Sequence, residues 1–170
     1  MSRSRYLWKS PCLMETLAPE ISDYELERGK PMPSLKHAII QRNLLVLNAG
    51  LSADYQVLPE LSLALDAQKA VPDVSVFLRS AIDPTVEQIA VTQVPRTAIE
   101  ILSPTQAIGE LLEKAARYFA AGVQSYWLVV PELRAVAVYS APKKYKYFYN
   151  GDTLVDPATG AEIVVSQLFD

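Results

Sequence analysis

Two apolar runs, separated by a stretch of helical spacing, dominate the pattern of hydrophobic and polar positions along the chain. The first run lies within 95–104 and the second within 125–131, and a helix containing Lys114 is expected between them, ending at Gly122. A strand, a helix and a strand in this order predict two parallel neighbours joined by a crossover helix. Glu100 interrupts the first run. Because an ionised carboxylate without partners is costly in a buried strand, Glu100 is a candidate for function.

The spacing also predicts which sides of the two long helices face the core. Ser34 is a good N-cap for a helix over 35–48. Two apolar faces are expected to be buried on this helix, one with Leu35, Ala38, Ile39, Leu45 and Val46, the other with Ile40, Leu44 and Leu47. In the later helix the expected core stripe contains Ile108, Leu112, Ala115 and Phe119. This stripe places Lys114 on the flank, beside Leu111 and Tyr118.

The remaining pattern predicts an α/β fold. Residues 1–18 show no clear period and are interpreted as a loosely held N-terminal arm, which leaves 19–170 as a single domain. A short helix within 19–28 carries Glu25. Strands are expected at 55–65, 71–77, 135–140, 143–149, 153–155 and 162–165. Asn150-Gly151 predicts the turn of a C-terminal β-hairpin. A mixed, twisted sheet flanked by α-helices accommodates all of these elements.

Composition and charge narrow the class of protein. Half of the 170 residues are hydrophobic, which is typical of a folded domain with a sizeable core. The net charge of −3 argues against a strongly basic, non-specific nucleic-acid binder, although it permits a local basic cleft. Cys12 is the only cysteine, which excludes a disulfide framework within one chain. No apolar stretch approaches the ~20 residues of a membrane span, and the N-terminus lacks the apolar core of a signal peptide, so we expect a cytoplasmic protein.

Acidic residues stand at the ends of two strands that are expected to be neighbours. Asp73 opens the strand of 71–77, Glu100 lies inside the next long strand, and Lys114 is on the helix after it. Two carboxylates at adjacent strand ends can share Mg²⁺ or Mn²⁺, which prefer oxygen ligands. Such a cation polarises a phosphoryl oxygen, while a nearby lysine can orient the attacking water. These are the groups needed for phosphodiester hydrolysis.

Each of these residues also has an ordinary structural interpretation. Asp73 follows Pro72, and aspartate beside proline is common in turns. His37 is the single histidine, and a histidine beside a core helix is more often a hydrogen-bonded polar neighbour than a ligand. Lys114 can be a solvated surface lysine, which is the usual place of lysine. Taken singly, the structural interpretation is the more common one for each residue.

Several segments together resemble a known family. Pro72-Asp73 followed by Glu100-Ile101-Leu102 resembles the PD-(D/E)XK nuclease superfamily, which has the restriction-endonuclease-like fold. More closely, the chain is similar to the Uma-type family of bacterial endonucleases, a group long labelled as of unknown function. This similarity is carried by Tyr24-Glu25-Leu26 with Gly29, His37, Val71-Pro72-Asp73-Val74, Ile99-Glu100-Ile101-Leu102-Ser103-Pro104, Lys114 with Tyr118, Ala121-Gly122-Val123 and Tyr126-Trp127-Leu128-Val129. It extends from about Tyr24 to the C-terminus.

The resemblance implies a metal-dependent nuclease. Asp73 and Glu100 would hold Mg²⁺ or Mn²⁺, with the backbone carbonyl of Ile101 as a third ligand. The superfamily motif has its lysine at the position of Leu102, so the resemblance implies that Lys114 positions the attacking water instead. The further residues implied for the site are Glu25 for a metal-bound water or a second metal, His37 and Gln41 for its lining, and Glu60 as a minor acid.

The strand expected at 143–149 contains residues that could contact a nucleic-acid substrate. Lys144 and Lys146 alternate with tyrosines, and cations with aromatic rings can hold phosphates and stack bases. The alternative is an edge hairpin whose lysines protect the sheet edge from pairing with another chain.

The favoured function is cleavage of nucleic acid, most readily DNA, and the rival is a nuclease-like module that only binds a protein or nucleic acid. We expect a homodimer, because two sites related by a two-fold axis suit the cutting of both strands of a duplex.

Overall fold

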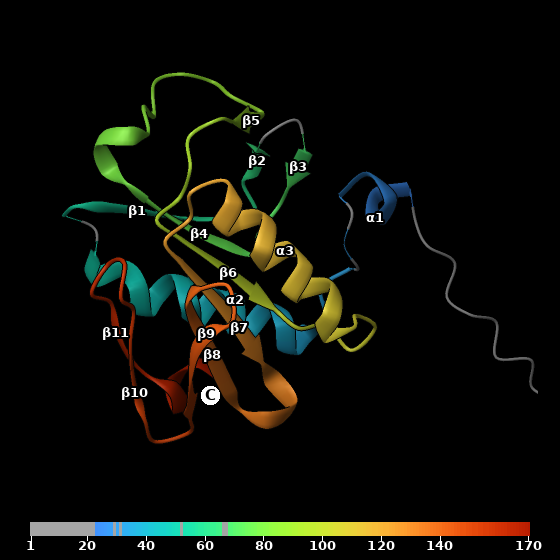
Figure 1. Ribbon diagram of the computed structural model, residues 1–170, viewed down its shortest axis with the longest axis vertical. Coiled ribbons are helices and arrows are strands. Elements are labelled where there is room, and N and C mark those ends of the chain that lie inside the picture. Colours follow the sequence, from blue (N-terminus) through green and yellow to red (C-terminus); the bar gives the residue numbers. More distant parts are fainter. Residues whose placement is uncertain (1–22, 29, 31, 52, 66–67) are drawn as a thin grey trace, which may run out of the picture.

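A six-stranded mixed sheet forms the centre of the computed structural model, which describes residues 23–170 apart from 29, 31, 52, 66 and 67 (Figure 1). In spatial order its strands are β1 (Tyr55–Pro59), β4 (Val74–Leu78), β6 (Thr97–Ile101), β7 (Ser125–Val130), β8 (Ala135–Ala141) and β9 (Lys144–Tyr149). Only β6 and β7 pair in parallel among these strands. The predicted mixed α/β fold is therefore confirmed, whereas the predicted arm of 1–18 lies outside the described residues.

The helices lie on both faces of this sheet. They are α1 (Asp23–Arg28), α2 (Leu35–Leu47) and α3 (Ile108–Ala120), and short 3₁₀ turns cover Asn48–Leu51, Arg79–Ala81, Pro131–Leu133 and Val165–Leu168. In Figure 1, α3 crosses in front of the sheet and α2 lies behind it. The connection from β6 through α3 to β7 is the predicted parallel crossover unit. Gly122 follows α3 with φ of 101°, a left-handed conformation that favours glycine.

Two small sheets extend the fold. One contains β3 (Gln68–Ala70), β2 (Ser62–Leu65) and β5 (Ala90–Val91), and the other contains β10 (Thr153–Val155) and β11 (Glu162–Val164). Asp156 fastens the second small sheet to the large one, because its carboxylate accepts hydrogen bonds from Thr97 Oγ1 at 2.7 Å and Trp127 Nε1 at 3.2 Å. The buried Asp156 is thus a structural carboxylate whose partners lie on β6 and β7.

Alternate residues of the central strands fill two separate cores. Ile99, on β6, packs with Ile40 of α2 on one face of the sheet. Ala98 packs with Leu111 and Tyr118 of α3 on the other face. Since side chains alternate along a strand, Glu100 shares the face of Ala98 and points toward α3. The sheet pleat thereby directs the one acid of this strand to the helix that carries Lys114.

The predicted faces of both long helices need correction. On α2, Leu35 is 79% exposed and Val46 is 65% exposed, so the first predicted face is not a core face. The buried side instead includes polar His37 and Asn43, and Asn43 Nδ2 donates to the carbonyl oxygens of Leu168 and Asp170 at 3.1 and 2.9 Å. These tertiary hydrogen bonds make polar burial favourable, which a hydrophobic pattern does not register.

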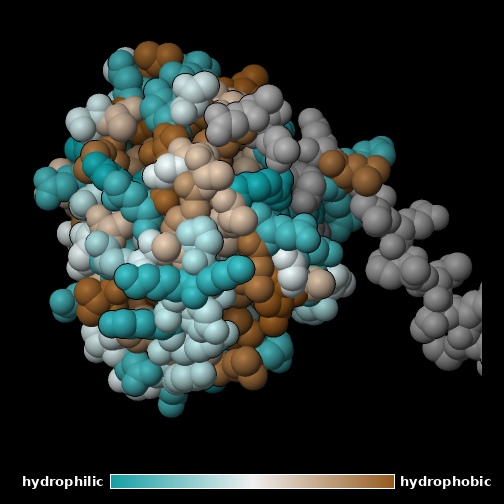
Figure 2. Space-filling view, in the orientation of Figure 1, coloured by the Kyte–Doolittle hydropathy of each residue, from teal (hydrophilic) through white to brown (hydrophobic). Residues whose placement is uncertain are grey.

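On α3 the core stripe is Leu111, Ala115 and Tyr118, whereas the predicted stripe members Ile108 and Leu112 are exposed. The sheet therefore contacts the side of the helix that was predicted to be a flank. Ile108 and Leu112 border an open groove beside the tyrosines of β9. In the space-filling view from the α3 side, hydrophobic and hydrophilic residues are interspersed over the surface (Figure 2).

The predicted hairpin at Asn150-Gly151 is also corrected. Strand β9 pairs with β8, and β10 pairs with β11, so the turn joins strands of different sheets. Asp152 tightens this turn, since its carboxylate accepts a hydrogen bond from the Tyr149 backbone N–H at 2.7 Å. The C-terminal hairpin that forms is β10 with β11. Leu168 is fully buried, and Phe169 packs against the same core.

Candidate functional site

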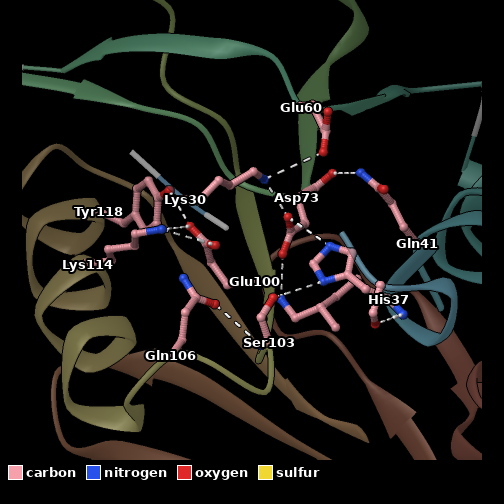
Figure 3. Close-up of polar contacts among 12 residues, drawn as sticks. Lys30, His37, Gln41, Glu60, Asp73, Glu100, Ser103, Gln106, Lys114 and Tyr118 are labelled. Atoms are coloured by element: carbon pink, nitrogen blue, oxygen red, sulfur yellow. Dashed lines mark hydrogen bonds and ion pairs between the residues drawn. The ribbon is translucent and has the colours of Figure 1, made fainter. Parts of the chain in front are cut away.

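Two buried carboxylates meet where β4 and β6 adjoin. The strands are antiparallel with Val74 opposite Ile99, so Asp73 and Glu100 stand opposite each other one step further along. Opposite side chains in such a pair share one face of the sheet with Cβ atoms about 5 Å apart. Asp73 and Glu100 are each 1% exposed. The sequence-predicted acids are therefore brought together, and Figure 3 shows both carboxyl groups with their polar contacts.

Asp73 is surrounded by donors. Its Oδ2 accepts a hydrogen bond from the backbone N–H of Ile101 at 2.7 Å, and its Oδ1 lies 3.2 Å from His37 Nε2 and 2.5 Å from Lys30 Nζ. Burial by itself would raise the pKa of Asp73. The hydrogen bond from His37 and the positive charge of Lys30 oppose burial and hold the pKa below its ordinary value. Asp73 is therefore an ionised carboxylate near neutral pH.

Glu100 is in the opposite electrostatic situation. Its Oε1 accepts a hydrogen bond from Tyr118 Oη at 2.8 Å, and Lys114 Nζ lies 3.4 Å from both of its oxygens. Burial first, and then the negative charge of Asp73, raise the pKa of Glu100 to about 7, although Lys114 acts in the other direction. The two acids thus have pKa values that are pushed apart, a pattern that clusters at functional sites.

Lys114 reaches the site from α3. Its side chain is 17% exposed, and it lies on the same helix side as Leu111 and Tyr118, which face the sheet. Its ammonium is within hydrogen-bonding reach of Glu100, so this flank lysine points toward the acids rather than into solvent. Tyr118 was not predicted as a site residue. Burial raises the pKa of its phenol, which therefore stays protonated and donates to Glu100.

Lys30 is a second lysine at the site, and it was not predicted. Its side chain is only 7% exposed, and its ammonium lies between Asp73 and Glu60, 3.7 Å from Glu60 Oε1. Pro31 and Pro33 follow Lys30 in the sequence, a composition that is typical of a linker rather than of a site. In the structure, Glu25 Oε1 accepts a hydrogen bond from the Met32 backbone N–H at 2.9 Å, which ties Met32 to α1. Glu25 was among the predicted site residues, and this backbone N–H is one of its partners.

His37 and Gln41 come from α2 and orient Asp73. His37 Nδ1 lies 3.4 Å from Ser103 Oγ, while its other nitrogen faces Asp73, so the ring bridges α2 to the end of β6. Gln41 Nε2 donates to the backbone carbonyl of Asp73 at 2.8 Å. Ser34 caps the first turn of this helix by accepting from the His37 backbone N–H at 3.2 Å. Both predicted lining residues therefore lie at Asp73.

The predicted nucleic-acid contacts lie apart from these acids. Lys144 and Lys146 are exposed on β9, the edge strand, which is three strands from β6 and so roughly 14 Å away across the sheet. Tyr145, Tyr147 and Tyr149 are about half exposed on the same strand and contact one another in series. The structure thus places these two lysines at the sheet edge rather than at the carboxylates.

The oxygen atoms at this site fit a hard divalent cation that takes only a few of its ligands from the protein. Among the described residues, no group of three or more histidine, cysteine or acidic side chains is arranged to hold a metal. Asp73 and Glu100 nevertheless offer two carboxylates. Burial and then the charge of Asp73 raise the pKa of Glu100, and a cation relieves the repulsion between the two acids. Magnesium commonly uses one or two carboxylates and keeps several waters.

The helices that the structure describes are too short or too polar to span a membrane.

Comparison with known proteins agrees with this geometry. The family model Uma2, described as "Putative restriction endonuclease", matches residues 12–166. A crystal structure described as a putative nuclease belonging to DUF820 from Anabaena variabilis ATCC 29413 is similar with a TM-score of 0.73 and 27% identity, over 82% of this chain and 83% of that chain. A DrdV–DNA complex solved by cryo-EM matches with a TM-score of 0.41 and 13% identity, over 72% of this chain and 10% of that chain.

No curated protein matches the chain significantly. The family model covers nearly the whole sequence, and the Anabaena structure shares the fold over most of both chains. The restriction-endonuclease-like mixed α/β fold expected from the sequence is confirmed, and both comparisons support a nuclease. The chain belongs to the Uma2 family of putative restriction endonucleases.

Proposed function

We propose that this protein is a metal-dependent endonuclease that hydrolyses phosphodiester bonds of DNA. The observation that carries the proposal is the pair Asp73 and Glu100, buried opposite each other with Lys114 on Glu100. A fold without chemistry gains nothing from two facing buried acids, because each ion loses its hydration there. Their arrangement is explained if a divalent cation is their shared partner.

Mg²⁺ or Mn²⁺ would be held by Asp73, Glu100 and the backbone carbonyl of Ile101. When bound, the cation would supply polarisation of a phosphoryl oxygen and a lowered pKa for bound water. The other tasks belong to the chain. Lys114 positions the attacking water and stabilises negative charge that develops on the phosphate. Tyr118 and His37 fix the orientations of the two carboxylates through the hydrogen bonds described above.

Cationic side chains of α3 line a cavity that could admit an anionic substrate. A cavity of about 160 Å³ is lined in part by Lys114, Arg117 and Tyr118, and two of these residues, Lys114 and Tyr118, also contact Glu100. The cations there are supplied by α3, so a phosphate entering this cavity comes within reach of Lys114. We further propose that Lys144 and Lys146 contact the DNA backbone outside the reacting site. We also propose that Glu25 binds a metal-bound water or a second metal, as the family resemblance implies.

Cleavage of plasmid DNA with Mg²⁺ or Mn²⁺ tests this function. Lys114→Ala and Asp73→Asn are each expected to lose about a hundredfold or more in rate, which is typical for one positioned catalytic group. Lys36→Ala is the matched control, because Lys36 is a surface lysine with 57% side-chain exposure that pairs with Glu132. Equal cleavage by wild type and Lys114→Ala would refute the assigned role of Lys114.

A second candidate function is a nuclease-like module that binds a partner without cutting. The net charge of −3 favours it, since most of the surface does not attract a polyanion. This rival predicts nucleic-acid or protein binding that is indifferent to Mg²⁺ and unaffected by Lys114→Ala. Metal-dependent cleavage by the wild type would exclude it.

A further inference from the structure

A positive charge of the chain already occupies the place where a cation would bind Asp73. Lys30 Nζ contacts Asp73 Oδ1, lies near Glu60, and lowers the pKa of Glu100 through its charge, so it acts on all three acids. Its side chain is almost fully buried. Lysine is almost never buried this deeply unless it is paired, and here the partner is the principal predicted metal ligand. Figure 3 shows the Lys30 ammonium directed into the cluster.

The two lysines of the site are delivered by different kinds of element. Lys114 comes from the middle of α3, a thirteen-residue helix whose buried side packs on the sheet. Lys30 comes from the short connection between α1 and α2, outside the sheet and its two long helices. A described hydrogen bond that holds this connection is the one from Met32 N–H to Glu25 of α1. Lys30 therefore comes from outside the helices and strands, whereas Lys114 is held by a helix packed on the sheet.

Both oxygens of Asp73 are committed in this arrangement. Oδ2 accepts from the Ile101 N–H, while Oδ1 has both Lys30 and His37 as neighbours. A divalent cation that coordinates Oδ1 would stand within a few ångströms of the Lys30 ammonium, and like charges at that range repel strongly in a buried site. One of the two cations must leave. Lys114, which lies at Glu100 rather than Asp73, meets no such conflict on Oδ1.

We propose that Lys30 is an internal competitor of the metal. Its ammonium neutralises Asp73 in the metal-free protein and withdraws from Asp73 when Mg²⁺ or Mn²⁺ binds, so that metal loading is coupled to loss of the Lys30–Asp73 ion pair. The inference rests on the proposed function, because it requires that the metal bind at Asp73. It assigns Lys30 to regulation of the site, whereas Lys114 acts on the substrate.

The first test is Mg²⁺ binding to the full chain, measured by isothermal titration calorimetry for wild type, Lys30→Met and Lys36→Met. Methionine keeps the length of the stem and removes the charge. Lys30→Met is expected to bind Mg²⁺ at least about tenfold more tightly, a gain of about 1.4 kcal/mol. Lys36→Met, which alters an exposed lysine, should bind like the wild type. Equal or weaker binding by a folded Lys30→Met would overturn the proposal.

The second test does not depend on that variant folding. The ammonium protons of Lys30 exchange slowly when the side chain is buried in an ion pair, so its ¹⁵N–¹H signal can be followed in wild-type protein. Saturating Mg²⁺ should abolish or shift this signal, and an unchanged signal in metal-loaded protein would refute displacement. If neither wild type nor Lys30→Met binds Mg²⁺, the proposed metal site itself fails. If both bind equally, only the competition by Lys30 fails.

Discussion

Neutralising Glu100 should change how the stability of the metal-free protein depends on pH. Glu100 has an ordinary pKa of 4.5, which burial and the charge of Asp73 raise to about 7 in the folded state. A group whose pKa is raised by folding stabilises the protein below its unfolded pKa and loses that contribution as the pH rises through the folded pKa. The wild type should therefore lose stability between about pH 4.5 and pH 7.

The size of this loss follows from the shift. Each pKa unit corresponds to about 1.4 kcal/mol, so the change in pKa of Glu100 amounts to about 3 kcal/mol across that range. Asp73 does not offset it there. Its pKa is lowered below the ordinary value of 3.8, so its stabilising contribution is present throughout this range and is lost only at lower pH. Glu100→Gln keeps an acceptor for Tyr118 and removes the ionisation.

Urea denaturation in EDTA at pH 5, 6, 7 and 8 measures the effect. The free energy of unfolding of Glu100→Gln, relative to wild type, should rise by about 2.5 kcal/mol from pH 5 to pH 8, because part of the loss already occurs below pH 5. Glu113→Gln is the matched control, because Glu113 is an exposed acid on α3, and its curve should parallel the wild type. A difference between Glu100→Gln and wild type that stays constant from pH 5 to pH 8 would refute a raised pKa at Glu100.

Two further predictions concern metal and assembly. Mg²⁺ or Mn²⁺ should raise the melting temperature of the wild type by binding the folded state, and Asp73→Asn should abolish the rise in differential scanning fluorimetry. An equal rise in Asp73→Asn would place the metal elsewhere. Light scattering should return a homodimer, twice the 18.8 kDa of one chain, because two-fold related sites suit the cutting of a duplex. A value near 18.8 kDa at working concentration would contradict this.

The unit from β6 through α3 to β7 could be predicted because its signals are local. Its strands are mainly apolar runs, and Gly122 marks the end of its helix. The facing of Asp73 and Glu100 follows from two neighbouring strands with acids at matching ends. The pattern could not predict the side of α3 that faces the sheet, because Ile108 and Leu112 are as apolar as the residues that are buried.

Lys30 and the buried side of α2 depend on contacts that are distant along the chain. Lys30 meets an acid 43 residues away, and Asn43 is buried because it binds the carbonyl of Leu168, 125 residues away. Neither contact leaves a periodic trace in the sequence. A lysine followed by Pro31 and Pro33 is typical of a linker, and an asparagine in a helix is typical of a surface, so only the tertiary structure shows that both are buried.

The location of a bound ion tests the central claim most directly. Crystals soaked in Mn²⁺ and measured for anomalous scattering should show a peak within about 2.0–2.5 Å of carboxylate oxygens of both Asp73 and Glu100, the range for hard cations on oxygen ligands. The same crystals of Asp73→Asn should lack it. A peak bound away from these two carboxylates, or none at saturating Mn²⁺, would contradict the proposal that the facing acids are a metal site.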